Sequence, residues 1–233
     1  MKKILLCFCI LAMITSLSCN DDETSNTPSG LIYSYFPVNV GHEVIYDVVH
    51  ITKDDFNSDD DTAIYQVKEI IESQFEDNEG RTTQRIERYT RSTPNDPWVI
   101  SDVWTSNLTP TRAEKKEENI SYVKLVFPIN TNAEWNGNTL NTLEPQTYSY
   151  MNIHESDMVG GITFDSTISV LQNEIDYFTN YGYEIEKFAP GVGLIYKQKD
   201  SIVWDNDNNI PPQNPPPIKS QDLYKETIVS WSN

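Results

Sequence analysis

The sequence predicts a mainly β fold, an antiparallel sheet arranged as a sandwich or a partly open barrel, with at most one or two short helices. Three observations predict it. About ten segments are rich in β-branched and aromatic residues. Glycine, proline and asparagine turn signals separate these segments. No long stretch shows the 3.6-residue periodicity of an amphipathic helix.

The predicted elements follow one another along the chain. The first strand, 44–51, is β-branched and aromatic, and it leads into the turn-rich acidic stretch 53–61. Further strands are expected at 63–72, 82–91, 98–105, 122–127, 147–153, 162–171, 183–188, 193–198 and 224–231. Apolar residues at positions 171, 175 and 178 recur at helical spacing, so we expect one short helix in 171–178.

The first 18 residues form a leader and not a part of the fold. Lys2 and Lys3 give it a basic start, and an apolar run and small residues follow, which is the layout of a secretory signal peptide. The apolar run is shorter than the roughly 20 residues that span a bilayer. Cys19 would be the first mature residue, as in a bacterial lipoprotein, and acyl chains on its sulfur would anchor the protein stably.

An acidic cluster, Asn20-Asp21-Asp22-Glu23, follows this cysteine directly. It resembles the export signal of surface-exposed lipoproteins in Bacteroidetes, which implies anchoring in the outer membrane with the domain exposed at the cell surface. The residues before Cys19 depart from the usual lipoprotein pattern, because Ser16 stands where leucine is common and Leu17 where a small residue is common. Anchoring at the periplasmic face and plain secretion therefore stay open as alternatives.

The organisation of the mature chain follows from its composition. Residues 19–30 are polar and should form an acylated, flexible acidic tether, and residues 31–233 are long enough for one β-rich domain. The stretch 205–220 is rich in asparagine and contains five prolines, so we expect an exposed loop. The cysteines are Cys7, Cys9 and Cys19. The mature domain therefore has no disulfide and no thiol nucleophile.

Charge excludes one class of partner. Cleavage of the leader removes Lys2 and Lys3, which moves the formal net charge from −18 to −20. A protein with this negative charge repels the phosphate backbone of nucleic acids and anionic lipid headgroups. The charge therefore argues against nucleic-acid binding. Attachment to a membrane must therefore depend on the acyl anchor.

A second resemblance spans most of the mature chain. Its motifs are the Phe-Pro bends at 36–37 and 127–128, the Trp-Asn-Gly-Asn turn at 135–138 and the segment APGVGLIYK at 189–197. In this order they resemble uncharacterised Bacteroidetes lipoproteins of similar size. The resemblance implies a lipid-anchored β-rich domain and brings no known activity or catalytic residue with it.

Catalytic motifs are incomplete. His42-Glu43 and His154-Glu155 begin like the zinc-protease motif, but Tyr46 and Met158 stand where its second histidine is required. The chain has no Gly-x-Ser-x-Gly elbow and no glycine-rich phosphate loop. A pair of carboxylates could hydrolyse glycosides, although the sequence does not place such a pair. We therefore predict that the protein is not an enzyme.

Calcium is the one ion that the sequence suggests. Asp55, Asn57, Asp59 and Asp61 alternate as oxygen ligands do in a calcium loop. Residue 60 is an aspartate where an EF-hand needs glycine, and residue 66 is a glutamine where it needs glutamate. We therefore expect a solvated acidic hairpin tip, with weak calcium binding as the alternative, and no other cofactor.

Aromatic residues give the last candidates. Trp98 and Trp104 could stack against sugars. Counting by two from Trp98 places Ile100, Asp102 and Trp104 on one strand face, and the isoleucine favours a core role for that face.

These observations predict a lipid-anchored envelope protein that acts as a noncatalytic binding or structural module and contacts glycans or other envelope proteins. The alternative is a carrier of a lipid or another apolar ligand inside a curved sheet or barrel. A hydrolase built on a carboxylate pair is the third reading.

Overall fold

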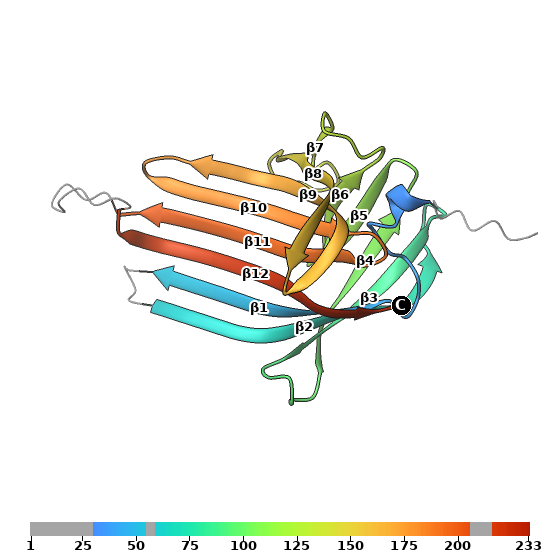
Figure 1. Ribbon diagram of the computed structural model, residues 1–233, viewed down its shortest axis with the longest axis horizontal. Coiled ribbons are helices and arrows are strands. Elements are labelled where there is room, and N and C mark those ends of the chain that lie inside the picture. The colour runs from blue at the N-terminus through green and yellow to red at the C-terminus, as the bar shows by residue number, and fades with distance from the viewer. Residues whose placement is uncertain (1–29, 55–58, 206–215) are drawn as a thin grey trace, which may run out of the picture.

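The computed structural model describes residues 30–54, 59–205 and 216–233, and it confirms the predicted fold class. In this part of the chain twelve strands form one antiparallel sheet, in the order β6-β5-β4-β3-β2-β1-β12-β11-β10-β9-β8-β7. Most neighbours in the sheet are also neighbours in sequence, so the sheet is a meander apart from the pairing of β1 with β12. Figure 1 shows it curling into a nearly closed barrel.

The elements have these bounds: a 3₁₀ turn η1 (Leu31–Tyr33), β1 (Glu43–Asp54), β2 (Asp59–Glu76), β3 (Thr82–Arg91), β4 (Val99–Leu108), β5 (Arg112–Glu117), β6 (Ile120–Val126), β7 (Glu134–Asn136), β8 (Thr147–Val159), β9 (Ile162–Asp176), β10 (Asn180–Ala189), β11 (Gly193–Trp204) and β12 (Ile218–Ser232). The last strand begins within the predicted loop 205–220, of which residues 206–215 lie outside the described residues. The structure contains no helix of the described chain that is long and apolar enough to cross a membrane.

One backbone hydrogen bond and two side chains join the two edges of the sheet. The Val123 N–H on β6 donates to the Gly137 carbonyl at 3.0 Å, and the Trp135 indole N–H donates back to the Val123 carbonyl at 2.9 Å. The Tyr150 hydroxyl on β8 accepts from the Val126 N–H at 2.9 Å and donates to the Val126 carbonyl at 2.7 Å. These bonds satisfy edge groups of β6 that no further strand pairs, so the barrel closes there without a continuous ladder.

Apolar side chains from both halves of the sheet meet in the core. One cluster joins β4–β6 to β8–β10 and also takes in the segment after η1, where Tyr35 is 1% exposed. Phe36 and Phe127, which begin the two Phe-Pro bends, both belong to this cluster. Each buried side chain of this size contributes roughly 1.5–3 kcal/mol. Residues 31–36 therefore cover one end of the barrel.

The helix expected at 171–178 is wrong, because β9 continues to Asp176. Leu171 pairs with Ile185 and Ile175 with Gly182 on β10, so this stretch alternates as a strand does. Leu171 and Ile175 fit a strand that carries a bulge, since the register shifts between Glu184 and Ile185, and Phe178 lies in the turn after β9.

The end of the β8–β9 hairpin folds back over the sheet, as Figure 1 shows in yellow. Asp157 on β8 pairs with Lys187 on β10 at 2.6 Å. Gly160 in the turn lies against β12, because a Cβ added there would be 2.3 Å from the Ile228 carbonyl oxygen. Asn152 has a positive φ of 48°, and the β8–β9 register shifts nearby, between Met151 and Glu155. This irregular stretch of β8 marks where the hairpin leaves the regular sheet.

The described chain starts and finishes at the same end of the molecule. In Figure 1, η1 and the C-terminal end of β12 lie on the right, and the β9–β10 turn, the end of β1 and the start of β2 lie on the left. At the left end Tyr177 is 67% exposed and Phe178 is 76% exposed.

Candidate functional site

The concave face of the sheet carries charged residues among apolar ones. Along β2, Val67, Glu69 and Ile71 share this face because side chains two apart in a strand point the same way. Cross-strand register then aligns charge with charge: Glu69 pairs with Arg88 on β3. In the other half of the sheet, Glu186 on β10, Lys197 on β11 and Glu226 on β12 are aligned in one row.

One group of ion pairs joins β6 to β10 and β11 across the barrel interior. Lys124, whose side chain is 6% exposed, donates to Glu186 Oε1 at 2.8 Å and lies 3.0 Å from Glu117 Oε1. Lys197 Nζ lies 3.2 Å from Glu117 Oε2 and 3.7 Å from Glu186 Oε1. Two ammonium groups and two carboxylates thus neutralise one another in the interior.

A second group lies beside the first. Lys115 donates to Glu69 Oε2 at 2.8 Å, and the Arg88 Nε lies 3.5 Å from Glu69 Oε1. The Arg88 guanidinium also pairs with Glu226, and it stacks on the Trp104 ring with its central carbon 4.5 Å from the ring centroid. The Arg88 guanidinium therefore lies over the face of the Trp104 ring, which is the favourable geometry for a cation near an indole.

The electrostatic balance keeps these groups charged. Burial alone would raise the pKa of Glu117, but the ammonium groups of Lys124, Lys197 and Lys115 hold that pKa well below its usual value. The pKa of Glu69 is likewise lowered, by Lys115 and Arg88 against the effect of burial. Burial would lower the pKa of Lys124 and Lys197, yet the neighbouring carboxylates raise both. Both carboxylates named here stay ionised at neutral pH.

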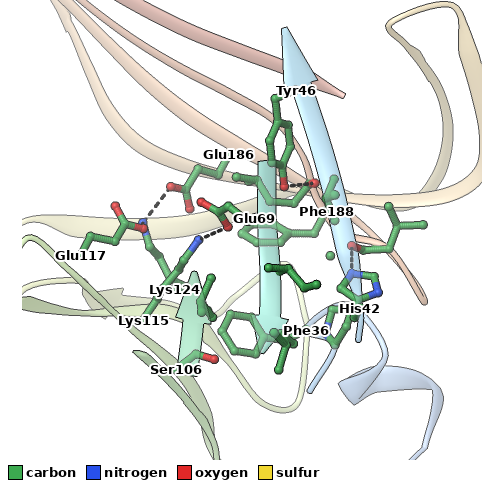
Figure 2. A pocket seen from close by; sticks show the side chains of 18 residues that line it. Phe36, His42, Tyr46, Glu69, Ser106, Lys115, Glu117, Lys124, Glu186 and Phe188 are labelled. Carbon is green, nitrogen blue, oxygen red and sulfur yellow. Dashed lines mark hydrogen bonds and ion pairs between the residues drawn. The ribbon is translucent and has the colours of Figure 1, made fainter. Parts of the chain in front are cut away.

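Beside these ion pairs lies a small cavity of about 70 Å³. Figure 2 shows its charged wall, with Glu69, Glu117 and Glu186 next to Lys115 and Lys124, and the phenyl rings of Phe36 and Phe188 close by. The apolar part of its lining comprises Phe36, Val44, Ile71, Ile86, Phe188, Val192 and Leu194. Ligand pockets commonly have about 300–1,000 Å³, so this cavity suits a much smaller molecule than a lipid.

Part of the cavity wall is fixed by hydrogen bonds to the β10–β11 turn. His42 Nε2 lies 3.0 Å from the Val192 carbonyl oxygen, and the Tyr46 hydroxyl donates to the Leu194 carbonyl at 2.9 Å. Since the side chains of His42, Tyr46 and Ser106 already bond to other groups, the polar side chains that remain for a ligand lie at the charged end. Within the described residues no group of three or more His, Cys, Asp or Glu side chains is arranged to hold a metal ion.

The three histidines have separate partners. His42 contacts the β10–β11 turn, His50 lies 2.9 Å from Asp222, and His154 Nδ1 lies 2.7 Å from the Tyr35 hydroxyl. None of these contacts brings one histidine to another.

The structure separates the two tryptophans that counting by two had placed on one face. The β3–β4 register shifts between Arg88 and Tyr89, so that Arg88 pairs with Asp102 and Tyr89 with Ile100, and Ser101 is an extra residue. Trp104 is 8% exposed and belongs to the core. Trp98 is half-buried under other cations, with the Arg91 guanidinium 4.1 Å and the Lys68 ammonium 5.3 Å from its ring centroid.

Other predicted site residues fall partly outside the described chain. Cys19 and Asn20 to Glu23 lie outside it, as do Asp55 and Asn57 of the predicted calcium series. Asp59 and Asp61 belong to β2, where they pair in register with Asp54 and Thr52 of β1. The calcium prediction therefore stays a prediction.

Sequence reasoning missed the interior ion pairs. The available signal was a charged residue inside an apolar strand, as in Tyr122-Val123-Lys124-Leu125 and Ile185-Glu186-Lys187-Phe188. A charge in such a run is rarely buried without a partner. The pattern could have marked Lys124 and Glu186 as inward-facing, but it could not have paired residues 62 positions apart.

The sequence matches no protein-family model and no curated protein. Among solved structures it is similar to a crystal structure described as a "putative lipoprotein" from Parabacteroides distasonis, with 11% sequence identity and a TM-score of 0.41. The alignment covers 85% of this chain and 98% of that one. A superposition at this level does not extend to individual side chains, so it assigns no site residue.

Proposed function

We propose that this protein is a lipid-anchored protein of the bacterial cell envelope whose curled sheet is a noncatalytic binding module. The proposal that the module is noncatalytic rests on the ion pairs inside the barrel. A general acid or base works best when its pKa lies near the operating pH. Here Lys124 and Lys115 lower the pKa of Glu117, and Lys115 and Arg88 lower that of Glu69, so both are too acidic for this role.

The same geometry disfavours the two alternative functions. A glycosidase needs a carboxylic acid whose pKa is raised so that it can protonate the leaving group, whereas Glu69 and Glu117 have lowered values. A lipid carrier needs an apolar cavity of several hundred Å³. The cavity beside the interior ion pairs has about 70 Å³ and a charged wall, whereas larger hollows of about 290–850 Å³ lie elsewhere on the described chain and have polar side chains in their lining. A binding module is the function that both observations support.

Anchoring is proposed from Cys19 at the end of the leader, with the acidic residues after it favouring the outer membrane and the cell surface. The fold suits this arrangement, because the described chain begins at η1, at the end opposite the β9–β10 turn (Figure 1). The exposed Tyr177 and Phe178 would then lie far from the point of attachment, where glycans or other envelope proteins could contact them.

The anchor is tested with a Cys19→Ala variant of the full-length protein in a bacterium that acylates lipoproteins. We expect the variant to lose fatty-acid labelling and to leave the membrane fraction, because acyl chains supply its membrane affinity. The matched control is Cys9→Ala, which changes a cysteine within the leader and should still be labelled and pelleted with the membranes. A labelled Cys19→Ala protein that stays with the membranes would refute the anchor.

A further inference from the structure

One buried carboxylate oxygen in the cavity wall has no hydrogen-bond partner. Glu186 is 1% exposed. Its Oε1 accepts from Lys124 at 2.8 Å, whereas its Oε2 has no partner among the described residues. Leaving a buried acceptor without a donor costs about 1–3 kcal/mol, and more for a charged one. Glu186 is one of the residues that line the cavity, so a small rotation of its carboxylate would bring Oε2 to a donor on a molecule held there.

The rest of the wall indicates what else that molecule should carry. Phe36, Ile71 and Phe188 present apolar carbons to the same cavity. A buried water needs two to four polar partners, which this apolar side does not provide. A molecule with one polar head and an alkyl part matches both sides of the cavity. Its volume of about 70 Å³ has room for roughly five groups of water size, at about 10–15 Å³ each.

The balance of charges in the cavity wall indicates whether the polar group of the ligand is neutral or charged. Lys115, Lys124 and Lys197 are already matched by Glu69, Glu117 and Glu186. A cationic or anionic ligand would bring an unmatched charge into the interior, which is costly. A neutral hydroxyl or amide N–H supplies a donor without changing this balance.

We propose that the cavity binds a small neutral molecule, whose hydroxyl or amide N–H donates to Glu186 Oε2 and whose alkyl part packs against Phe36, Ile71 and Phe188. This inference names a ligand class for the binding module and so rests on that part of the proposed function. It does not depend on the acylation of Cys19.

The experiment uses four probes of similar size and different heads: 1-butanol, propionamide, n-butylammonium and propionate. Binding to the purified mature protein is measured by NMR, from saturation transfer to the probe and from shifts of the protein amide signals. We expect the two neutral donors to bind and to compete with each other, and the two charged probes to bind at least tenfold more weakly. Equal binding of charged and neutral probes, or no binding of any probe, would overturn the proposal.

Two variants locate the site. Val192→Ile adds a methylene to a residue that lines the cavity, and Val159→Ile adds one to a buried residue of the same apolar cluster that does not line it. We expect the first to weaken binding of 1-butanol at least fivefold and the second to leave it unchanged. Identical affinities in the two variants would place the probe elsewhere and refute the assignment. Loss of probe binding with intact acylation of Cys19 would leave the anchor standing, so the two failures are distinguishable.

Discussion

At the scale of single residues, Lys124 makes two of the ion pairs inside the barrel. Its ammonium lies within 3.0 Å of carboxylate oxygens from β5 and from β10, and its side chain is 6% exposed. A buried ion pair adds little net stability compared with apolar packing, but removing one partner leaves the other charge uncompensated. Lys124 therefore pairs with carboxylates from both halves of the sheet, and its removal would leave Glu117 and Glu186 with less positive charge to compensate them.

A Lys124→Met variant tests this role. Methionine has a similar length, so the main loss is the positive charge beside Glu117 and Glu186. We expect the free energy of unfolding to fall by about 3–5 kcal/mol, measured by urea denaturation. The control is Lys116→Met on the neighbouring strand β5, where the lysine is exposed and the change should stay within about 0.5 kcal/mol. A similar loss in both variants would show that Lys124 is not a buried partner.

The pH dependence of Glu117 follows from the direction of its pKa shift. Burial raises its pKa, but Lys124, Lys197 and Lys115 lower it well below 4.5, so the ionised form stabilises the folded state. That contribution is fully present above the unfolded pKa of about 4.5 and is lost as pH falls through the folded pKa.

We therefore compare the unfolding free energies of the wild type and a Glu117→Gln variant from pH 7 down to pH 3. The difference between them should be constant down to about pH 5 and should shrink below it. Using the difference removes the general effect of lower net charge at acidic pH, which both proteins share. A difference that grows as the pH falls would contradict the lowered pKa of Glu117.

At the scale of elements, the β8–β9 hairpin depends on a close approach that only glycine permits. Gly160 has a φ of 60°, and a Cβ there would lie 2.3 Å from the Ile228 carbonyl oxygen. Gly161 has a φ of 79° with nothing within 4 Å of its added Cβ. At both positions the positive φ disfavours any residue with a side chain. At Gly160 a side chain would also clash with the Ile228 carbonyl oxygen.

Alanine at each glycine separates the two effects. Gly161→Ala should cost about 1–2 kcal/mol, which is the strain of a left-handed conformation. Gly160→Ala should cost at least about 1 kcal/mol more, because the methyl group displaces the hairpin from β12. Urea denaturation of both variants checks this. Equal losses would mean that the hairpin does not contact β12 in solution.

Sequence pattern predicted the strands that are apolar or β-branched and missed those that are neither. The predicted strand 82–91 coincides with β3, whereas β5, Arg112–Glu117, was not predicted because five of its six residues are charged. It is a strand because its alanine packs in the core and its neighbours β4 and β6 pair with it. Tertiary pairing overrode local propensity there.

At the scale of the whole molecule, sequence pattern predicted the fold class but could not choose between sandwich and barrel. That choice depends on where the sheet edges meet, and bonds such as Trp135 to Val123 and Tyr150 to Val126 decide it. The cavity depends on the same closure, since its lining comes from eight different strands as well as the segment after η1 and the β10–β11 turn. Contacts this distant along the chain leave no local sequence signal.

At this scale we propose that acylation of Cys19 attaches the sheet to the membrane at the end where the described chain begins, opposite the β9–β10 turn (Figure 1). Tyr177 and Phe178 would then lie far from the membrane attachment. The cavity lies toward the η1 end by virtue of the fold itself, since Phe36 lines it.

The most direct test is therefore mass spectrometry of the N-terminal peptide of the protein isolated from membranes. The account predicts that this peptide begins at Cys19 and carries two or more acyl chains, which is the number that stable anchoring requires. A peptide that begins after Cys19, or one that begins at Cys19 without any acyl chain, would contradict it.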